Sequence, residues 1–478
     1  MSSETKLTKI LTHKITLSSI VLLSFFLRFS NLNYNSPSLD ESSYLLLGKL
    51  GIFQGNWLEY NPTSWMGGAF FFYPILSALA SVNSGIVGAR ALNVAIGSLA
   101  IILVYLLVKN LRFFSEDYLN KLAAVVTAFF FAISPIAIIL SRLAVYDILS
   151  FTLFILGIVL LQKSFSTKSR IFTTFSSLAL LFSFLAKYFS FVFLPFVGAS
   201  VLLWSLKTLK GKALLLNLGF FSAPLLFGFG LYFLLSLENL KIFFFEQVTT
   251  KDSFKTIWAI FLENIRLSWL FASVSLLFLV LFLRKKIYFP LFLYLIPFLI
   301  LLTHLVSYRA LAIEKHVLYG TVAFFTVSGI ALAQLFRMSQ VLFMVISLVL
   351  TFLIGVNSWQ EVSKFESSWP NSTQAMTFLR ERVTPHDRIL AQDGSATVVL
   401  FEKIIPGQVI TLFSFDYKDL SGEEAYTKAI EDRYFDFIQL DQFSENTKSL
   451  SDKIRLALDK KYNLIYHRDR IEIYKRTS

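Results

Sequence analysis

Eleven long apolar runs follow one another along this chain, and short basic segments separate many of them. A helix needs about 20 apolar residues to cross roughly 30 Å of hydrocarbon, and the runs approach that length. Only 16% of the 478 residues are charged, whereas about 25% is usual in a soluble domain. These charges are too few to coat a water-soluble globule of this size, so we predict a polytopic membrane protein.

The predicted spans cover residues 15–30, 86–108, 121–140, 145–162, 171–186, 188–206, 213–235, 267–283, 287–305, 317–336 and 339–357. The first run lacks a small-residue cleavage site before Arg28, so we expect a retained signal-anchor helix. Two longer connections, 31–85 and 236–266, interrupt the series. The first contains the apolar stretch 69–80, which is too short to span and is predicted to form an interfacial or re-entrant helix.

Basic residues give the orientation, because short cytoplasmic loops carry an excess of Lys and Arg. With the amino terminus inside, six cytoplasmic segments hold Lys6, Lys9, Lys14, Lys109, Arg112, Lys121, Lys163, Lys168, Arg170, Lys207, Lys210, Lys212, Arg284, Lys285, Lys286 and Arg337. Residues 361–476 contain 17 basic and 19 acidic side chains, which leaves 27 basic and 12 acidic for the rest. We therefore predict a plasma-membrane protein with eleven crossings, the amino terminus inside and the charged tail outside.

The predicted fold class is an all-α polytopic membrane domain over residues 1–357, with a small extracytoplasmic α/β domain over 358–478. In the tail, expected helices at 372–381, 422–430 and 449–458 alternate with short strand-like runs at 388–392, 408–413, 435–440, 463–466 and 471–474. A structural lid or partner-docking role suits this domain better than an active site of its own.

Ionisable residues within or beside the spans are candidate functional groups, because each costs several kcal/mol in a membrane unless it is paired or hydrated. They gather on the outer side, and they are Asp40, Glu41, Arg90, Arg142, Asp147, Lys187, Glu314, Lys315 and His316. The carboxylate pair is the sharpest feature, since one member could act as a general base while its neighbour orients a substrate or a cation.

Each candidate also has a plain structural explanation. Asp40 and Glu41 could cap a helix at 41–52, and Arg142 could pair with Asp147 between helices. Arg90 and Lys187 could extend to the lipid headgroups, and His316 could cap an interface. The five histidines show no pair with the spacing of a metal site.

Several common activities lack their usual signatures in this sequence. The sequence contains no GxxxxGK[ST], GxGxxG, HExxH or GxSxG motif, and cysteine is absent, which excludes disulfides and a Cys nucleophile. The basic balance is explained by membrane topology, so no nucleic-acid partner is expected. Cations beside carboxylates at the outer interface suit a substrate with a phosphate at headgroup level and a lipid tail in the bilayer.

A set of short motifs lies in a fixed order along residues 15–340. The motifs are Arg28-Phe-Ser-Asn-Leu, Pro37-Ser-Leu-Asp40-Glu41-Ser-Ser-Tyr44, Gly55-Asn-Trp57-Leu, Phe72-Tyr73-Pro74, Gly88-Ala-Arg90-Ala-Leu, Ser134-Pro135, Ser141-Arg142, Phe184-Leu-Ala-Lys187-Tyr188 and Glu314-Lys315-His316-Val-Leu-Tyr319. This set resembles the GT-C superfamily of glycosyltransferases, and most of all its protein O-mannosyltransferase and aminoarabinose transferase branch, which is family 39-like.

The resemblance implies a membrane enzyme of the cell envelope that transfers a hexose or pentose from a polyprenyl-phosphate-linked donor to a protein, lipid or glycan on the extracytoplasmic face. It assigns Asp40 as general base and Glu41 as a positioning group. The implied donor-phosphate contacts are Arg90, Lys187, Lys315 and His316, and the implied sugar or acceptor pocket contains Arg142, Asp147, Tyr44 and Tyr73. The resemblance implies no required cofactor, although Asp40 and Glu41 could together bind a divalent cation.

The match departs from the family pattern at two places. Many relatives of the aminoarabinose transferase type carry Lys-Pro-Pro where this chain has Phe72-Tyr73-Pro74, and Arg-Tyr is frequent where it has Lys315-His316. A transporter or lipid flippase is the alternative class, and it should show two matching halves with helices broken near mid-membrane. Only Gly228 and Gly230 interrupt a span, without a counterpart in the other half. A non-catalytic assembly subunit is the third class, and it would not need Asp40, Arg90 and Lys187 together.

Overall fold

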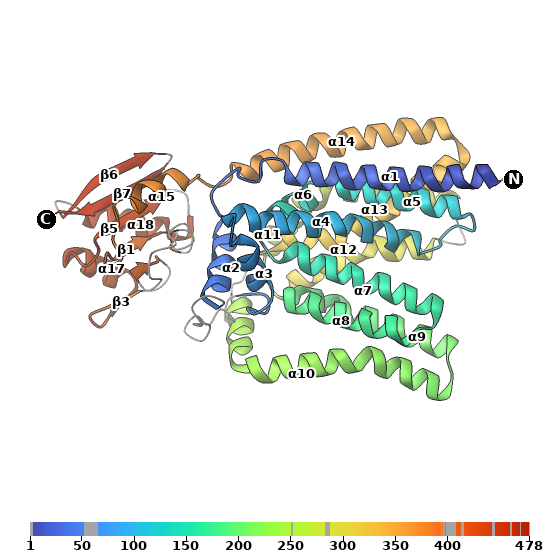
Figure 1. The fold of residues 1–478 in the computed structure, drawn as a ribbon, viewed down its shortest axis with the longest axis horizontal. Coiled ribbons are helices and arrows are strands. Elements are labelled where there is room, and N and C mark those ends of the chain that lie inside the picture. Colours follow the sequence, from blue (N-terminus) through green and yellow to red (C-terminus); the bar gives the residue numbers. More distant parts are fainter. Residues whose placement is uncertain are drawn as a thin grey trace.

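The computed structural model describes residues 3–51, 66–249, 252–282, 287–392, 394, 397, 408–412, 415–441, 445–458, 461–468 and 470–477. It consists of a bundle of long helices with a small mixed domain at one end (Figure 1). The amino terminus lies at the opposite end of the bundle from this domain (Figure 1). Trp57 and its flanking motif residues lie outside the described part of the chain.

Each predicted span is largely helical in its described residues, although 121–140 and 188–206 are each divided between two helices. The long helices are α1 (Ser3–Phe29), α4 (Gly85–Lys109), α5 (Asp117–Ala132), α6 (Pro135–Arg142), α7 (Asp147–Thr167), α8 (Arg170–Ala186), η3 (Tyr188–Phe193) with α9 (Leu194–Thr208), α10 (Gly211–Thr249), α11 (Phe254–Phe282), α12 (Tyr288–Val306), α13 (Ile313–Met338) and α14 (Gln340–Glu366). Within the described residues, eight helices are long and apolar enough to cross a membrane, or nine if the bent pair α5 and α6 forms one span.

The bend between α5 and α6 was not predicted. The two helices meet at 58°, and the single expected span 121–140 contains the break. Ser134 caps α6 by accepting a hydrogen bond from the Ala137 backbone N–H, and Pro135 occupies its first turn. Proline disfavours a helical conformation at the preceding residue, so the chain must turn there.

Three further helices, α10, α11 and α14, extend beyond the predicted bounds of their spans. Helix α10 continues to Thr249 through Pro224, and α11 already begins at Phe254, so the expected connection 236–266 is largely helical. Helix α14 runs on to Glu366, past the predicted end of its span at residue 357. A hydropathy window ends where charged residues interrupt the apolar run, whereas these helices continue past such residues.

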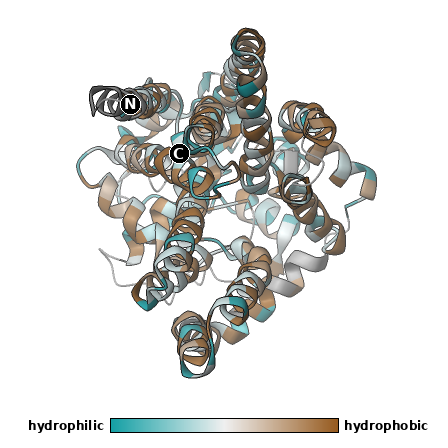
Figure 2. Ribbon diagram, turned by 90° about the vertical axis from the view of Figure 1, so that its right-hand side faces the viewer, coloured by the Kyte–Doolittle hydropathy of each residue, from teal (hydrophilic) through white to brown (hydrophobic). Residues whose placement is uncertain are grey.

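Helix α13 forms the centre of the bundle, and the whole apolar window that was tested on it is buried. It packs against α5, α11 and α12. A Cβ at Gly329 would overlap with Thr127 and the Ala123 carbonyl on α5, so glycine permits this close approach. In contrast, α10 and α14 are buried over only 11% of their windows. Apolar residues are prominent along the outer helices (Figure 2), as expected for helices that face lipid.

Two short helices close the end of the bundle near the C-terminal domain (Figure 1). They are α2 (Leu39–Lys49) and α3 (Tyr73–Ser81), so the expected short helix in the first connection is present. Gly48 lets them pack tightly, because a Cβ there would overlap with the Pro74 carbonyl.

The C-terminal domain has the predicted α/β character. Its five-stranded sheet has the order β2-β1-β5-β7-β6, in which β1 pairs parallel with β2 and β5, and β7 pairs antiparallel with β5 and β6. The strands are β1 (Ile389–Ala391), β2 (Val409–Ile410), β5 (Phe437–Asp441), β6 (Tyr462–Arg468) and β7 (Ile471–Arg476), and the helices are α15 (Thr373–Arg380), α17 (Gly422–Glu431) and α18 (Glu445–Ala457). The hairpin β3 (Asp416–Tyr417) with β4 (Leu420–Ser421) was not predicted.

Candidate active site

The ten predicted site residues lie where α2, α3, α4, α6, α7, α8 and α13 meet, at the end of the bundle that carries the C-terminal domain. Their charged groups form separate ion pairs rather than one open cluster. Glu41 pairs with Arg90, Asp40 with Lys315, Asp147 with Lys187, and Arg142 with Glu366.

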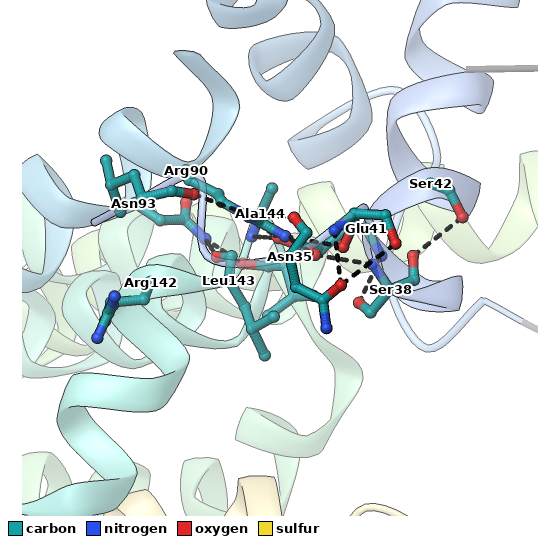
Figure 3. Close-up of polar contacts among 12 residues, drawn as sticks. Asn35, Ser38, Glu41, Ser42, Arg90, Asn93, Arg142, Leu143 and Ala144 are labelled. Carbon is teal, nitrogen blue, oxygen red and sulfur yellow. Dashed lines mark hydrogen bonds and ion pairs between the residues drawn. The ribbon is translucent and has the colours of Figure 1, made fainter. Parts of the chain in front are cut away.

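Glu41 and Arg90 form a fully buried, two-point ion pair (Figure 3). The Arg90 Nε and Nη2 groups each donate to one Glu41 carboxylate oxygen at 2.8 Å. The remaining Arg90 donors reach three backbone carbonyls, those of Leu32 at 2.8 Å, Asn35 at 3.0 Å and Ser36 at 3.3 Å. All five guanidinium N–H groups are therefore engaged within the protein.

The carboxylate of Glu41 is occupied just as completely. Its oxygens also accept from the backbone N–H groups of Ala144 at 2.8 Å and Ser38 at 2.9 Å. The Ser38 contact belongs to a capping box, in which the Ser38 side chain accepts from the Glu41 backbone N–H. Glu41 thus fixes the start of α2 and ties it to the segment between α6 and α7.

Arg142 turns away from Glu41 (Figure 3) and does not pair with Asp147. Its Nη1 lies 2.6 Å from Glu366 at the end of α14, and its Nη2 donates to the carbonyls of Ser30 and Asn31. Arg90 and Arg142 both lie against the Tyr34 ring. Arg142 therefore connects the ends of α1, α6 and α14.

Asp40, one position before Glu41, faces the other way and pairs with Lys315 on α13. This pair is the most accessible of the four, with 42% of the Asp40 side chain and 23% of the Lys315 side chain exposed. Within the described residues, Asp40 is the one carboxylate at ion-pair distance from Lys315, whereas Glu41 pairs with Arg90. Asp40 is consequently the one member of the predicted carboxylate pair that a substrate can reach without breaking a buried contact.

Asp147 and Lys187 form a deeper pair, with only 4% and 7% of their side chains exposed. Asp147 opens α7, and Lys187 stands at the break between α8 and η3. The Lys187 ammonium lies 5.4 Å from the centre of the Tyr146 ring, within cation–π range. One Asp147 oxygen, Oδ2, is buried without a hydrogen-bond partner, so this pair retains an unused acceptor.

Three tyrosines join the two lysine pairs. The Tyr44 ring lies 4.7 Å from Tyr146 and 6.3 Å from Tyr73. Burial, with Asp40 as the next largest contribution, raises the pKa of Tyr44 well above its usual range. Burial likewise raises the pKa of Tyr73. Both phenols therefore stay protonated and keep an O–H group that can donate a hydrogen bond.

His316 belongs to a histidine pair that the sequence did not predict. Its Nδ1 lies 2.9 Å from Nε2 of His304, whose Nδ1 lies 2.7 Å from the Arg309 carbonyl. Phe189 stacks on His316 at 3.5 Å between ring centres. The turn between α12 and α13 brings the two rings together. Their spacing of twelve residues in the sequence does not predict this contact.

The residues that could hold a metal ion are divided among these contacts. Asp40 and Glu41 bind different cationic side chains. In the described part of the chain, no group of three His, Asp or Glu side chains converges on a point.

An apolar cavity of about 640 Å³ lies within the bundle, between α7, α9, α12 and α13. Phe154, Phe193 and Tyr319 are among its lining residues. Phe154 is seven residues from Asp147 on α7, which corresponds to about 10 Å along a helix. The Tyr319 hydroxyl also bonds Ser150 at 2.9 Å, one turn from Asp147. The upper edge of the cavity therefore lies about two helical turns from the deeper ion pair, and the cavity extends away from it along α7.

Comparison with solved structures supports the GT-C fold that the motifs implied. ArnT from Cupriavidus metallidurans bound to undecaprenyl phosphate superimposes with a TM-score of 0.63 at 13% identity, covering 96% of this chain and 97% of that one. The oligosaccharyltransferase AglB from Archaeoglobus fulgidus, in complex with an inhibitory peptide and a dolichol-phosphate, gives a TM-score of 0.58 at 14% identity, covering 98% and 74%. No protein-family model matches the sequence, and no curated protein matches it.

Proposed function

We propose that this chain is a membrane glycosyltransferase that moves a hexose or pentose from a polyprenyl phosphate to an acceptor on the extracytoplasmic face. The observation that carries the proposal is that two lysine–carboxylate pairs stand about one to two helical turns from the near edge of a 640 Å³ apolar cavity. A phosphate near Lys187 and Lys315 would leave its prenyl chain in the cavity. The similar structures, ArnT with undecaprenyl phosphate and AglB with dolichol-phosphate, support this class of donor.

The reaction would be a single displacement. A donor phosphate competes with Asp40 and Asp147 for the two lysines, which stabilise the charge on the leaving group. Asp40, released from Lys315, accepts the proton of the acceptor hydroxyl as its oxygen forms a bond to the anomeric carbon. The bond from that carbon to the phosphate oxygen breaks at the same time, so polyprenyl phosphate leaves and the configuration inverts.

Glu41, Arg90 and Arg142 receive a different role in this proposal from the one implied by the motifs. Glu41 and Arg90 pair with each other, Arg142 pairs with Glu366, and backbone groups bind their remaining polar atoms. We therefore assign these three residues to the framework that holds α2 against α4 and α6. Tyr44, Tyr73 and Asp147 remain the proposed lining of the sugar pocket.

Purified protein reconstituted with membrane extract and a panel of radiolabelled polyprenyl-phosphate sugars tests the proposal. We expect label to pass from at least one donor to protein, lipid or glycan, with release of polyprenyl phosphate and inversion at the anomeric carbon. If every donor is only moved across the bilayer, without cleavage of the phosphate bond, the protein is a flippase and not a transferase.

The cavity gives a prediction on donor length. We expect Ser200→Trp, which places an indole at the rim of the cavity, to raise KM for long-chain donors about tenfold, because the ring takes the space of the distal prenyl units and removes their packing contacts. Donors with short chains should be used as before. Leu202→Trp is the control, since Leu202 is exposed on the same helix and does not line the cavity. Equal effects on short and long donors would place the chain elsewhere.

A further inference from the structure

A second crevice lies away from the candidate active site. It has a volume of about 340 Å³ and is lined by residues of α6, α11, α13 and α14. The facing helices α11 and α14 supply its charged groups, whereas α6 and α13 supply apolar and hydroxyl side chains. Thr321 of α13 lines this crevice, whereas Tyr319 and Val322 on the same helix line the apolar cavity, so the two spaces are separated by α13.

The charged groups of the crevice are mostly unused. In the described part of the chain, Arg266, Asn357 and Glu361 have no hydrogen-bond or ion-pair partner. Lys364 and Glu263 lie 3.7 Å apart, and each side chain is about 70% exposed. The crevice therefore offers two cations and two carboxylates, with a net charge of zero.

Its depth in the membrane follows from the sequence of the two facing helices. Glu263 and Arg266 stand just before the apolar run of α11 that begins at residue 267, and Glu361 and Lys364 stand just after the apolar run of α14 that ends at 357. Charges that flank apolar runs in this way lie at the level of the lipid headgroups.

The inner surface of the crevice is polar as well. Ser134, Ser268 and Thr321 line it and are almost fully buried. The hydroxyls of Ser268 and Thr321 donate to carbonyls of their own helices, so each oxygen can still accept a hydrogen bond. Acyl chains cannot satisfy such groups, whereas a polar headgroup can.

We propose that this crevice binds the headgroup of a phospholipid that carries both a phosphate and a primary ammonium group. Arg266 and Lys364 would bind the phosphate, because guanidinium and ammonium groups form strong, charge-assisted bonds to phosphate oxygens. Glu361 and Glu263 would accept from the ammonium. The zero net charge of the crevice favours this zwitterion over an anionic lipid, and its apolar edge at Ile136, Ile139 and Leu267 suits the start of the acyl chains.

The site is independent of the proposed sugar transfer, so its test measures binding alone. The full-length protein is purified in detergent, incubated with phosphatidylethanolamine, phosphatidylcholine or phosphatidylglycerol, and analysed by native mass spectrometry. We expect the wild type to retain phosphatidylethanolamine in preference to the other two lipids. Arg266→Gln should weaken retention about fivefold, which corresponds to about 1 kcal/mol for one cation near a phosphate.

Glu361→Gln tests recognition of the ammonium group separately from recognition of the phosphate. It should abolish the preference for phosphatidylethanolamine over phosphatidylcholine, whose quaternary ammonium donates no hydrogen bond. Lys255→Gln is the control, because Lys255 is exposed on α11 and lies outside the crevice. Lys364→Gln, at a largely exposed position, provides a second variant should Arg266→Gln not fold. Wild-type retention without preference, or unchanged retention in Arg266→Gln and Lys364→Gln, would overturn the proposal.

Discussion

Replacement of Asp40 by Asn is expected to lower the rate of sugar transfer by about 10²- to 10⁴-fold, the range that a positioned general base contributes. The amide keeps the size of the side chain and removes its ability to take a proton. Because 42% of the Asp40 side chain is exposed, the fold should tolerate the change. The measurement is single-turnover transfer of label from the preferred polyprenyl-phosphate sugar at saturating donor.

A measurement of donor affinity distinguishes the role of Asp40 as a general base from a purely electrostatic effect of its charge. Asp40→Asn frees Lys315, so donor affinity should stay the same or increase while transfer is lost. Glu314→Gln is the matched control, since Glu314 is the neighbouring carboxylate at the start of α13 and is not part of the proposed machinery. It should change the rate by less than about twofold. A transfer rate in Asp40→Asn close to that of the wild type would rule out Asp40 as the base.

The helical architecture could be predicted because the apolar residues that define each span are contiguous in the sequence. An apolar window of about 20 residues identifies a crossing without knowledge of its neighbours. Such a window does not detect the bend at Ser134-Pro135, because α5 and α6 are both apolar and only the backbone direction changes between them. The continuations of α10 and α14 also escape it, since charged residues lower the mean hydropathy there although the backbone stays helical.

The structure brings the ten predicted residues to one end of the bundle, but which of them pair with each other could not be predicted from the sequence. Asp40 and Glu41 are adjacent in the sequence, yet successive residues of a helix point about 100° apart, and so they contact different cations. One local signal was available. The spacing Ser38-x-x-Glu41 is that of a capping box, and it indicates a structural role for Glu41. The pairing of His304 with His316 depends on the turn between α12 and α13, which spacing alone does not fix.

The second large effect is expected in stability. Arg90→Met should reduce the free energy of unfolding by about 3–5 kcal/mol, because it leaves the Glu41 carboxylate buried without its cation. The carbonyls of Leu32, Asn35 and Ser36 lose their donors in the same step. Glu41→Gln should have a comparable effect, since it leaves the Arg90 charge uncompensated. Thermal unfolding of the purified protein in detergent measures both.

The increase in the free energy of unfolding on binding of polyprenyl phosphate, the lipid product of transfer, distinguishes a framework role of Arg90 from a phosphate contact. A ligand that binds only the folded protein stabilises it by about 2.7 kcal/mol at 100 times its Kd. If Arg90 belongs to the framework, polyprenyl phosphate at that excess should stabilise Arg90→Met by nearly the same increment as the wild type. Glu238→Gln, which breaks an exposed pair with Lys241, should cost less than about 1 kcal/mol. A variant at Arg90 that unfolds like the wild type and no longer responds to polyprenyl phosphate would instead return Arg90 to the donor site.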